Sequence, residues 1–294
     1  MKVLTNESLS SYTTFCMGGI CKNMYFPQNK QELIQLALEK KDCRFIGGGS
    51  NLLINDSKEF DNVICLRELS QELDISDDGF VTASASVRLQ KLINFINKNG
   101  MGGIEYLFSV PGLVGGAIYM NAGRGKAFNC TIADHIVSVE VLCLEDTKFG
   151  GRGEVAELSK EDCCFGYRNS IFHSNSFLIL SAKFRFPEMS AEESAKRRKE
   201  RLDLCREKQD NLKPNFGSVF CEANPKLMKL VRKLQLGDKD GVHFSGKTNN
   251  WLLNSKGKKS EKGSFDKALK LIEKVKMLHK LFRKPCKPEV IIWK

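Results

Sequence analysis

The sequence predicts a mixed α+β fold made of more than one module. Segments with apolar residues at helical spacing alternate with segments rich in β-branched and aromatic residues, and two glycine-rich clusters interrupt them. A length of 294 residues suits two or three compact domains. The composition, 41% hydrophobic and 28% charged residues, is ordinary for a soluble globular protein.

Three segments differ in character. Residues 1–65 combine short strands with one helix, residues 66–186 are strand-rich, and residues 187–294 mix helices with short strands. The expected helices are 30–40, 89–97, 191–211, 225–236 and 265–283, the last with Ser264 as N-cap. The expected strands are 44–46, 80–87, 136–144, 177–186 and 289–293. The final strand could return to the first segment.

Charge and cysteine usage narrow the class of protein. The net charge is +11, and residues 226–294 hold 19 Lys and Arg against 6 Asp and Glu, which suits a phosphorylated ligand or a solvated surface. The eleven cysteines form no CxxC pair, so we expect reduced, mostly buried thiols and no metal site. The start lacks a signal peptide and no apolar run is long enough to span a membrane, so we expect a cytoplasmic protein without membrane insertion.

The first glycine cluster follows the strand at 44–46. It reads Gly47-Gly48-Gly49-Ser50-Asn51-Leu52, where bare backbone N–H groups could press against a pyrophosphate. It matches neither GxGxxG nor GxxxxGK[ST], so a classical Rossmann or P-loop site is not supported. By itself, such a triplet is equally explained by a tight structural turn.

The second cluster spans residues 109–123, SVPGLVGGAIYMNAG. Its density of small residues indicates either close approach to a large flat ligand or very tight helix packing. Two such clusters on either side of strand-rich sequence favour one extended ligand that contains a diphosphate.

Three later segments place polar residues among apolar ones. Arg168 lies in YRNSIF, where its guanidinium needs an anion or a structural ion pair. Ser218 follows a glycine between aromatic residues, and Glu289 precedes an apolar strand. None of the three is diagnostic alone.

Taken in order, these motifs resemble the UDP-N-acetylenolpyruvoylglucosamine reductase family. The resemblance runs from YTTF (12–15) and Gly18-Gly19 through GGGSNLL, PGLVGGAIYMNAG, YRNSIF, GSVF and SGKTNNWLLN (245–254) to PEV, and so covers nearly the whole chain. The short sequence around Tyr167 resembles the family's shorter form, which lacks an extra loop in the substrate domain.

The resemblance implies a bipartite FAD-binding unit of the vanillyl-alcohol-oxidase type, followed by a smaller α/β substrate-binding domain. FAD-binding subdomains would span 1–65 and 66–186, and the substrate domain 187–294. FAD would be held without a covalent bond, and NADPH would be the reductant. The implied FAD-binding residues are Gly47, Gly48, Gly49, Ser50, Asn51, Leu52, Pro111, Gly112, Gly115, Gly116, Ala117, Asn121, Ala122 and Gly123.

The implied reaction reduces UDP-N-acetylglucosamine enolpyruvate to UDP-N-acetylmuramate in peptidoglycan synthesis. Flavin N5 would give a hydride to the vinyl carbon, Arg168 would stabilise the charge that develops on the carboxylate, and Ser218 would protonate the α-carbon. Glu289, with a raised pKa in its apolar setting, would hydrogen-bond the carboxylate. The implied substrate-binding residues are Tyr167, Asn224 and Lys213, the last proposed from position alone.

The sequence departs from the family pattern at three places. Cys221-Glu222-Ala223 replaces a shorter segment with a lysine before Asn224, which puts the reach of Asn224 to the substrate in doubt. Thr248 stands where histidine is frequent, and Arg124-Gly125-Lys126 replaces Ala-Tyr-Gly. Because Arg168, Ser218 and Glu289 are all retained, we expect an active enzyme with altered peripheral contacts.

Other functions compete with this interpretation. A different flavin oxidoreductase of the same fold could attach FAD covalently, with His135 or Cys163-Cys164 as candidates, although neither lies in a glycine cluster. A flavin-free binding module is the second alternative, and a nucleic-acid-binding protein is disfavoured because few aromatic residues accompany the basic ones. We expect a monomer, because no self-complementary apolar helix or strand stands out.

Overall fold

The computed structural model describes residues 1–40, 42–124, 130–260 and 262–294. The chain divides into two compact units, and each is assembled from separate stretches of sequence. Unit 1 comprises Met1–Val3, Tyr25–Gly47 and Ile64–Asp203, and unit 2 comprises Leu4–Met24, Gly48–Val63 and Leu204–Lys294. This division follows packing alone, and the three functional segments stay a prediction.

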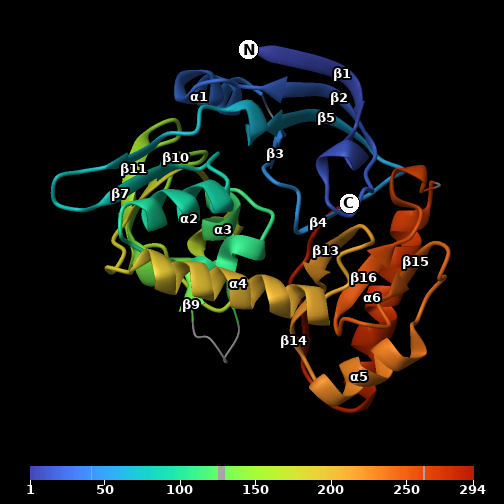
Figure 1. The fold of residues 1–294 in the computed structure, drawn as a ribbon. Coiled ribbons are helices and arrows are strands. Elements are labelled where there is room, and N and C mark those ends of the chain that lie inside the picture. Colours follow the sequence, from blue (N-terminus) through green and yellow to red (C-terminus); the bar gives the residue numbers. More distant parts are fainter. Residues whose placement is uncertain (41, 125–129, 261) are drawn as a thin grey trace. The chain divides into compact units, whose positions relative to one another are not determined.

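A five-stranded antiparallel sheet forms the centre of unit 1. Its order is β11-β10-β12-β7-β6, and its long strands β10 and β12 are buried along most of their length. The strands are β6 (Leu73–Ile75), β7 (Val81–Ser84), β10 (Ile136–Cys143), β11 (Val155–Ser159) and β12 (Phe177–Phe184). Helices α2 (Leu89–Lys98) and α3 (Val114–Tyr119) lie beside this sheet (Figure 1) and share one apolar core with it.

The remaining elements of unit 1 are short or peripheral. Helix α1 (Lys30–Glu39) begins at Asn29, whose side chain accepts from Glu32 N at 2.9 Å. A two-stranded ribbon joins β8 (Gly123–Arg124) to β9 (Cys130–Thr131). A second sheet has the order β1-β2-β5-β3. Its strand β3 (Arg44–Ile46) belongs to unit 1, whereas most residues of β1 (Lys2–Ser8), β2 (Ile20–Phe26) and β5 (Glu59–Cys65) belong to unit 2.

Unit 2 packs helices α5 (Pro225–Leu234) and α6 (Ser264–Leu281) with short strands around a second core. One sheet has the order β13-β16-β15, and two further pairs are β14-β17 and β18-β4. The strands are β13 (Asn215–Ser218), β14 (Phe220–Ala223), β15 (Val242–Phe244), β16 (Trp251–Asn254), β17 (Cys286–Pro288), β18 (Ile291–Trp293) and β4 (Leu52–Ile54). The pairing of β18 with β4 is parallel and brings the chain end beside residues that follow the first glycine cluster.

The predicted helices all form, with small changes at their ends. Helix α4 (Ala191–Lys208) stops three residues before the predicted Asn211, and Thr248 Oγ1 donates to the carbonyl of Lys208 at 3.2 Å. The prediction that Ser264 is the N-cap of α6 is wrong, because Gly263 holds that position. The Asp56 carboxylate accepts from Gly263 N and Phe265 N, both at 3.1 Å, and so replaces a serine cap.

The α+β prediction is confirmed. None of the helices in the described residues is both long and apolar enough to cross a membrane.

Candidate functional site

The first glycine cluster forms a turn in which Gly49 cannot be replaced without strain. Gly49 has φ +64°, and a Cβ there would lie 1.9 Å from the carbonyl oxygen of Tyr12. Thr14 N also donates to Gly49 O at 3.0 Å. The turn is therefore packed against the YTTF motif, which explains why both motifs occur together.

The first cluster also adjoins the second within unit 1. A Cβ on Gly47 would lie 3.3 Å from Cδ1 of Leu113, and the Gly47 carbonyl accepts from Arg67 Nε at 3.0 Å. Two glycine-rich segments that are about 60 residues apart in sequence thus meet at this point. Gly48 to Asn51 belong to unit 2, so the residues expected to bind FAD are divided between the units.

Two adjacent glycines of the second cluster serve different purposes. A Cβ on Gly115 would lie 2.8 Å from the Cβ of Ala85, so this glycine allows close packing of α3 on the sheet. Gly116 is exposed, and a Cβ there would have no neighbouring atom within 4 Å. Tight packing therefore accounts for Gly115 but not for Gly116, whose bare backbone is open to a ligand.

Arg168 is anchored on the end of the second cluster. Its Nη1 donates to Asn121 O at 3.3 Å and its Nη2 donates to Gly123 O at 2.5 Å. The guanidinium lies 5.1 Å from the centroid of the Tyr167 ring, and Tyr167 is 59% exposed. Arg168 has φ +53°, a left-handed conformation that is uncommon for a non-glycine residue. These contacts fix a half-buried positive charge beside the predicted flavin-binding segment.

Ser218 and Glu289 come together in unit 2. Glu289 N donates to the carbonyl oxygen of Val219 at 2.8 Å. Because Val219 directly follows Ser218, this bond holds the backbone at Glu289 next to the backbone at Ser218. No hydrogen bond joins the Ser218 hydroxyl to another of the described residues, and the side chain is partly exposed. The hydroxyl is therefore available to a ligand.

Asn51, in the first glycine cluster, forms hydrogen bonds with the backbone of Glu289 and Ile291. Its Nδ2 donates to Glu289 O at 3.1 Å, and its carbonyl accepts from Ile291 N at 3.0 Å. Within unit 2, one end of the first cluster is therefore held against Glu289, whose amide is held against the segment that carries Ser218.

Asn250 positions the Ser218 segment, and the sequence did not single it out. Its Oδ1 accepts from Phe220 N at 3.0 Å, its Nδ2 donates to Phe220 O at 2.7 Å, and its carbonyl accepts from Val219 N at 2.9 Å. Asn250 has φ +65°, which asparagine tolerates better than most residues. The doubled asparagine in SGKTNNWLLN was the available signal.

The residues at which the sequence departs from the family have defined structural roles. Residues 221–223 extend β14, which pairs with β17, and Asn224 caps α5 by accepting from Lys226 N and Leu227 N at 3.0 and 3.2 Å. Thr248 accepts from Asp210 N at 2.7 Å, while Lys213 Nζ donates to Ser255 Oγ at 2.9 Å. Gly125 and Lys126 lie outside the described residues.

The candidates for covalent flavin attachment differ in their environment. Burial raises the pKa of Cys163 to about 12, so its thiol is not ionised near neutral pH. Burial also lowers the pKa of His135, whose ring is tilted against that of Phe186, with 5.1 Å between the ring centroids. Cys163 is buried, whereas His135 is partly exposed and Cys164 is exposed, so burial argues against Cys163 as the attachment point.

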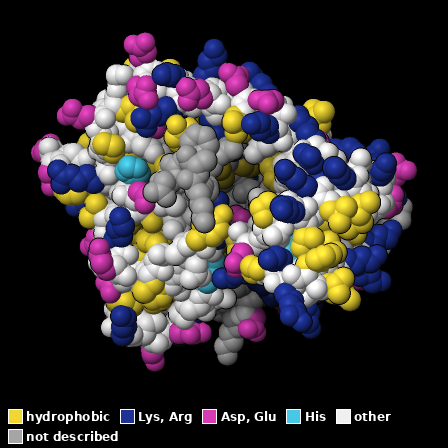
Figure 2. Space-filling view, turned by 90° about the horizontal axis from the view of Figure 1, so that it is seen from below, with side chains coloured by type: hydrophobic (Ala, Val, Ile, Leu, Met, Phe, Trp, Pro, Cys, Tyr) yellow, Lys and Arg dark blue, Asp and Glu magenta, His cyan; other side chains and the backbone are white. Residues whose placement is uncertain are grey.

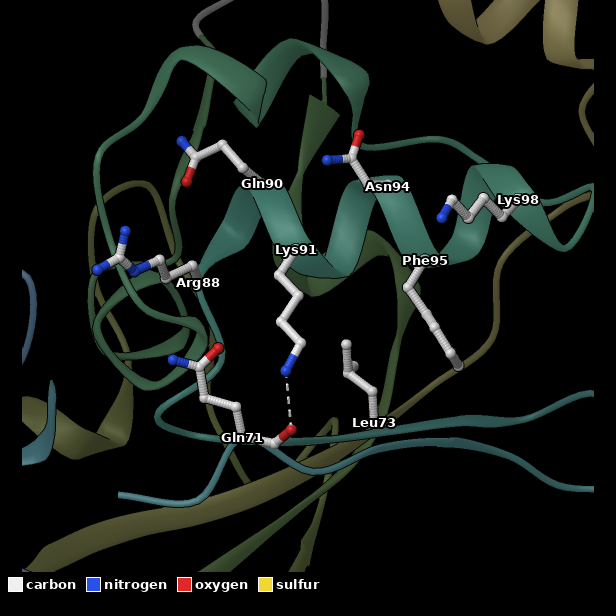
Figure 3. A pocket seen from close by; sticks show the side chains of 8 residues that line it. All are labelled: Gln71, Leu73, Arg88, Gln90, Lys91, Asn94, Phe95 and Lys98. Atoms are coloured by element: carbon white, nitrogen blue, oxygen red, sulfur yellow. Dashed lines mark hydrogen bonds between the residues drawn. The ribbon is translucent and has the colours of Figure 1, made fainter. Parts of the chain in front are cut away.

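A surface cavity of about 780 Å³ lies elsewhere on unit 1 (Figure 3). It is bordered by α2, and Lys91 Nζ donates across it to the Gln71 carbonyl at 3.1 Å. The lining residues are Gln71, Leu73, Arg88, Gln90, Lys91, Asn94, Phe95 and Lys98. None of them belongs to a glycine cluster or to the predicted site, so this cavity is not the predicted flavin site.

Comparison with known proteins agrees with these motifs. Residues 27–148 match the family model of an FAD binding domain. A UDP-N-acetylenolpyruvoylglucosamine reductase of Prochlorococcus marinus subsp. pastoris is 35% identical over 256 residues, which cover 84% of this chain and 83% of the relative. The enzyme of that name from Fusobacterium nucleatum is 32% identical over 222 residues, covering 75% and 74% of the two chains.

A solved structure shares the fold. The crystal structure of UDP-N-acetylenolpyruvylglucosamine reductase from Thermus caldophilus superposes with a TM-score of 0.76 and covers 100% of this chain and 98% of its own, at 24% identity. The predicted FAD-binding fold of the vanillyl-alcohol-oxidase type is thereby confirmed.

Proposed function

Because the chain belongs to the UDP-N-acetylenolpyruvoylglucosamine reductase family of flavin-dependent oxidoreductases, we propose that it reduces UDP-N-acetylglucosamine enolpyruvate to UDP-N-acetylmuramate. NADPH is the proposed reductant and FAD the proposed non-covalent cofactor. When bound, FAD would supply the hydride chemistry, taking a hydride from NADPH and giving it from N5 to the vinyl carbon of the substrate. The enzyme would act in the cytoplasm as a monomer, without nucleic acid as a partner.

The glycine clusters fit the proposed cofactor. Gly116 leaves backbone open to a ligand, and Gly47 and Leu113 bring the two clusters into contact. Glycine-rich backbone can approach a diphosphate closely because no Cβ intervenes. We propose that residues 47–52 and the second-cluster residues from Pro111 to Gly123 hold FAD, with Gly115 acting through packing.

Arg168 is proposed to bind the substrate carboxylate. Hydride addition to the vinyl carbon leaves negative charge that spreads through the α-carbon onto this carboxylate, and a fixed cation stabilises it. The carbonyls of Asn121 and Gly123 hold the guanidinium in place before substrate arrives. This support lowers the reorganisation that the charge would otherwise require.

Ser218 is proposed to protonate the α-carbon. The observation that carries this proposal is the meeting of Ser218, Glu289 and Asn51 in unit 2, with the Ser218 hydroxyl not engaged by another described residue. A serine hydroxyl is a weak acid, so its proton must be replaced through a hydrogen-bonded neighbour or water. Glu289 is proposed to hydrogen-bond the substrate carboxylate in its protonated form.

The UDP part of the substrate is proposed to contact Tyr167, Asn224 and Lys213. Asn224 already uses its side-chain oxygen to cap α5, so it would offer its Nδ2 group to a ligand. Lys213 is exposed and donates to Ser255, a contact that a phosphate could replace.

Cofactor content tests the flavin proposal. The purified protein should be yellow, should release FAD on acid denaturation, and should lose its visible flavin absorbance when NADPH is added without air. A colourless protein that takes up no added FAD would refute the assignment of both glycine clusters. Flavin that stays with the denatured chain would instead support the covalent alternative.

A further inference from the structure

Helices α5 and α6 expose large apolar side chains that neither core uses. Leu230 and Leu234 on α5 are 42% and 59% exposed, and Met277, Leu281 and Phe282 at the end of α6 are 69%, 77% and 54% exposed. Residues 226–234 and 274–284, which we name the α5/α6 patch, contain these five side chains. Single exposed apolar residues are common, but five on two helices of one unit require an explanation.

A buried histidine joins the two helices of the patch. Asn224 N, at the start of α5, donates to Nε2 of His279 at 3.0 Å. Nδ1 of His279 lies 2.8 Å from Val275 O, one turn earlier in α6, and the side chain is 0% exposed. The first turn of α5 is therefore fixed beside the last turns of α6, and both belong to unit 2.

The charge of the patch is strongly positive, although Lys276 pairs with Glu273, which precedes the second segment, at 2.9 Å. Its two segments contain nine Lys and Arg and no Asp or Glu. The basic residues are Lys226, Lys229, Arg232, Lys233, Lys274, Lys276, Lys280, Arg283 and Lys284. Figure 2 shows hydrophobic side chains gathered among Lys and Arg on its right-hand side, where Figure 1 shows α5 and α6.

On α5 the exposed apolar and basic residues share one face. Leu230 and Leu234 are four residues apart, and Lys226, Lys229 and Lys233 flank them at helical spacing. The opposite face is buried through Met228 and Val231. The helix is thus held to the core by one face and presents a basic and apolar face to its surroundings.

This chemistry excludes two occupants. A second copy of the same patch would place nine positive charges against nine others, which strongly disfavours a symmetric dimer. Nucleic acid would use the lysines but would gain nothing from exposed Leu and Met, and Phe282 is the one aromatic side chain in the two segments.

We propose that the α5/α6 patch docks on the surface of a bilayer that contains anionic lipid. Lys and Arg side chains would lie at the lipid headgroups, and Met277, Leu281 and Phe282 would reach the boundary of the acyl region. The contact is peripheral and reversible, with no segment crossing the bilayer. This proposal does not depend on the reaction that the enzyme catalyses.

Cosedimentation of the full-length FAD-loaded protein with vesicles tests the proposal. Vesicles of phosphatidylcholine with phosphatidylglycerol should bind the protein, whereas vesicles of phosphatidylcholine alone should not, and added salt should release it. In a fourfold variant, Lys229, Lys233, Lys280 and Lys284 are changed to Gln. The partition coefficient of this variant onto the anionic vesicles should fall about 100-fold or more, because the loss of each of the four lysines lowers it about fivefold.

A matched variant controls for net charge. Lys98→Gln, Lys148→Gln, Lys196→Gln and Lys199→Gln remove four exposed lysines of unit 1, and partition should stay close to that of the unchanged protein. Leu281→Gln with Phe282→Gln keeps the charge and should lower partition about tenfold for each side chain. Circular dichroism and FAD content should be unchanged, because the substituted side chains are exposed.

Two results would overturn the proposal. One is the lack of binding to anionic vesicles at low salt, which would leave an acidic protein as the partner chemistry to examine. The other is an equal loss of binding in the two fourfold variants, because net charge and not the patch would then be responsible.

Discussion

At the scale of single residues, backbone contacts determine where the reactive groups lie. Glu289 is tied through its amide to Val219 and through its carbonyl to Asn51, and Arg168 is tied to two carbonyls of the second glycine cluster. The side chain of Ser218 is left without a partner among the described residues. Replacing the Ser218 side chain should therefore change the rate of the reaction and leave the packing of the fold unchanged.

Ser218→Ala should therefore damage one half-reaction and spare the other. Reduction of the flavin by NADPH should keep its rate, while reoxidation by the enolpyruvyl substrate should slow by about 10²–10⁴-fold, because general acid catalysis is lost. Stopped-flow absorbance measures both steps. Ser218→Cys should recover part of the lost rate. Reoxidation of the Ala variant at the unchanged rate would show that Ser218 is not the donor.

The glycines of the two clusters offer a matched comparison. Gly49→Ala adds a Cβ at φ +64°, 1.9 Å from Tyr12 O, and should lower the free energy of unfolding by at least about 1–3 kcal/mol. Gly116→Ala meets no neighbouring atom within 4 Å and lies in a helix, so the apoprotein should gain up to about 1 kcal/mol.

The affinity for FAD gives a second comparison, which is independent of the stability of the apoprotein. Gly116→Ala should weaken FAD binding although it does not destabilise the apoprotein, because the new methyl group occupies space proposed for the cofactor. Urea unfolding of the apoproteins and titration with FAD give the two quantities. An unchanged FAD affinity in Gly116→Ala would remove Gly116 from the cofactor site.

At the scale of elements, Ser218 is the last residue of β13, and Asn250 holds the turn that joins β13 to β14. Its side chain satisfies both backbone groups of Phe220, which is 2% exposed. Such groups cost free energy when they are buried without a partner. The loop before β16 is therefore part of the site although none of its atoms is proposed to react.

Asn250→Gly should destabilise the protein by roughly 1–3 kcal/mol, since Phe220 loses its side-chain partner while the positive φ remains unstrained. Asn250→Ala should cost about 1 kcal/mol more, because alanine disfavours that backbone conformation. Chemical denaturation measures both values, and reoxidation kinetics should slow in each variant. If the Asn250→Gly protein is destabilised but its flavin is reoxidised at the normal rate, Asn250 contributes to folding and not to the reaction.

At the scale of the whole molecule, local patterns predicted the elements but not their assembly. Helices such as α2 and α5 followed from apolar spacing and flanking Gly, Asn and Pro residues. The Asp56 cap of α6 and the parallel pairing of β18 with β4 join residues more than 200 positions apart. No local window contains such partners, so the discontinuous units could not be derived from spacing.

The same limit applies to the site. Arg168, Ser218 and Glu289 were recognised from the order of the motifs along the chain, although none of the three is diagnostic alone. Asn51 and Asn250 act through hydrogen bonds to distant backbone, and an asparagine in a loop has many ordinary roles. Their contribution to positioning became visible with the fold.

The most direct test is reoxidation of the NADPH-reduced enzyme by UDP-N-acetylglucosamine enolpyruvate without air. The visible flavin absorbance should return in full, and UDP-N-acetylmuramate should form in an amount equal to the flavin reoxidised. Flavin that stays reduced in the presence of this sugar nucleotide, yet is reoxidised by another acceptor, would contradict the proposed substrate while leaving the flavoprotein fold intact.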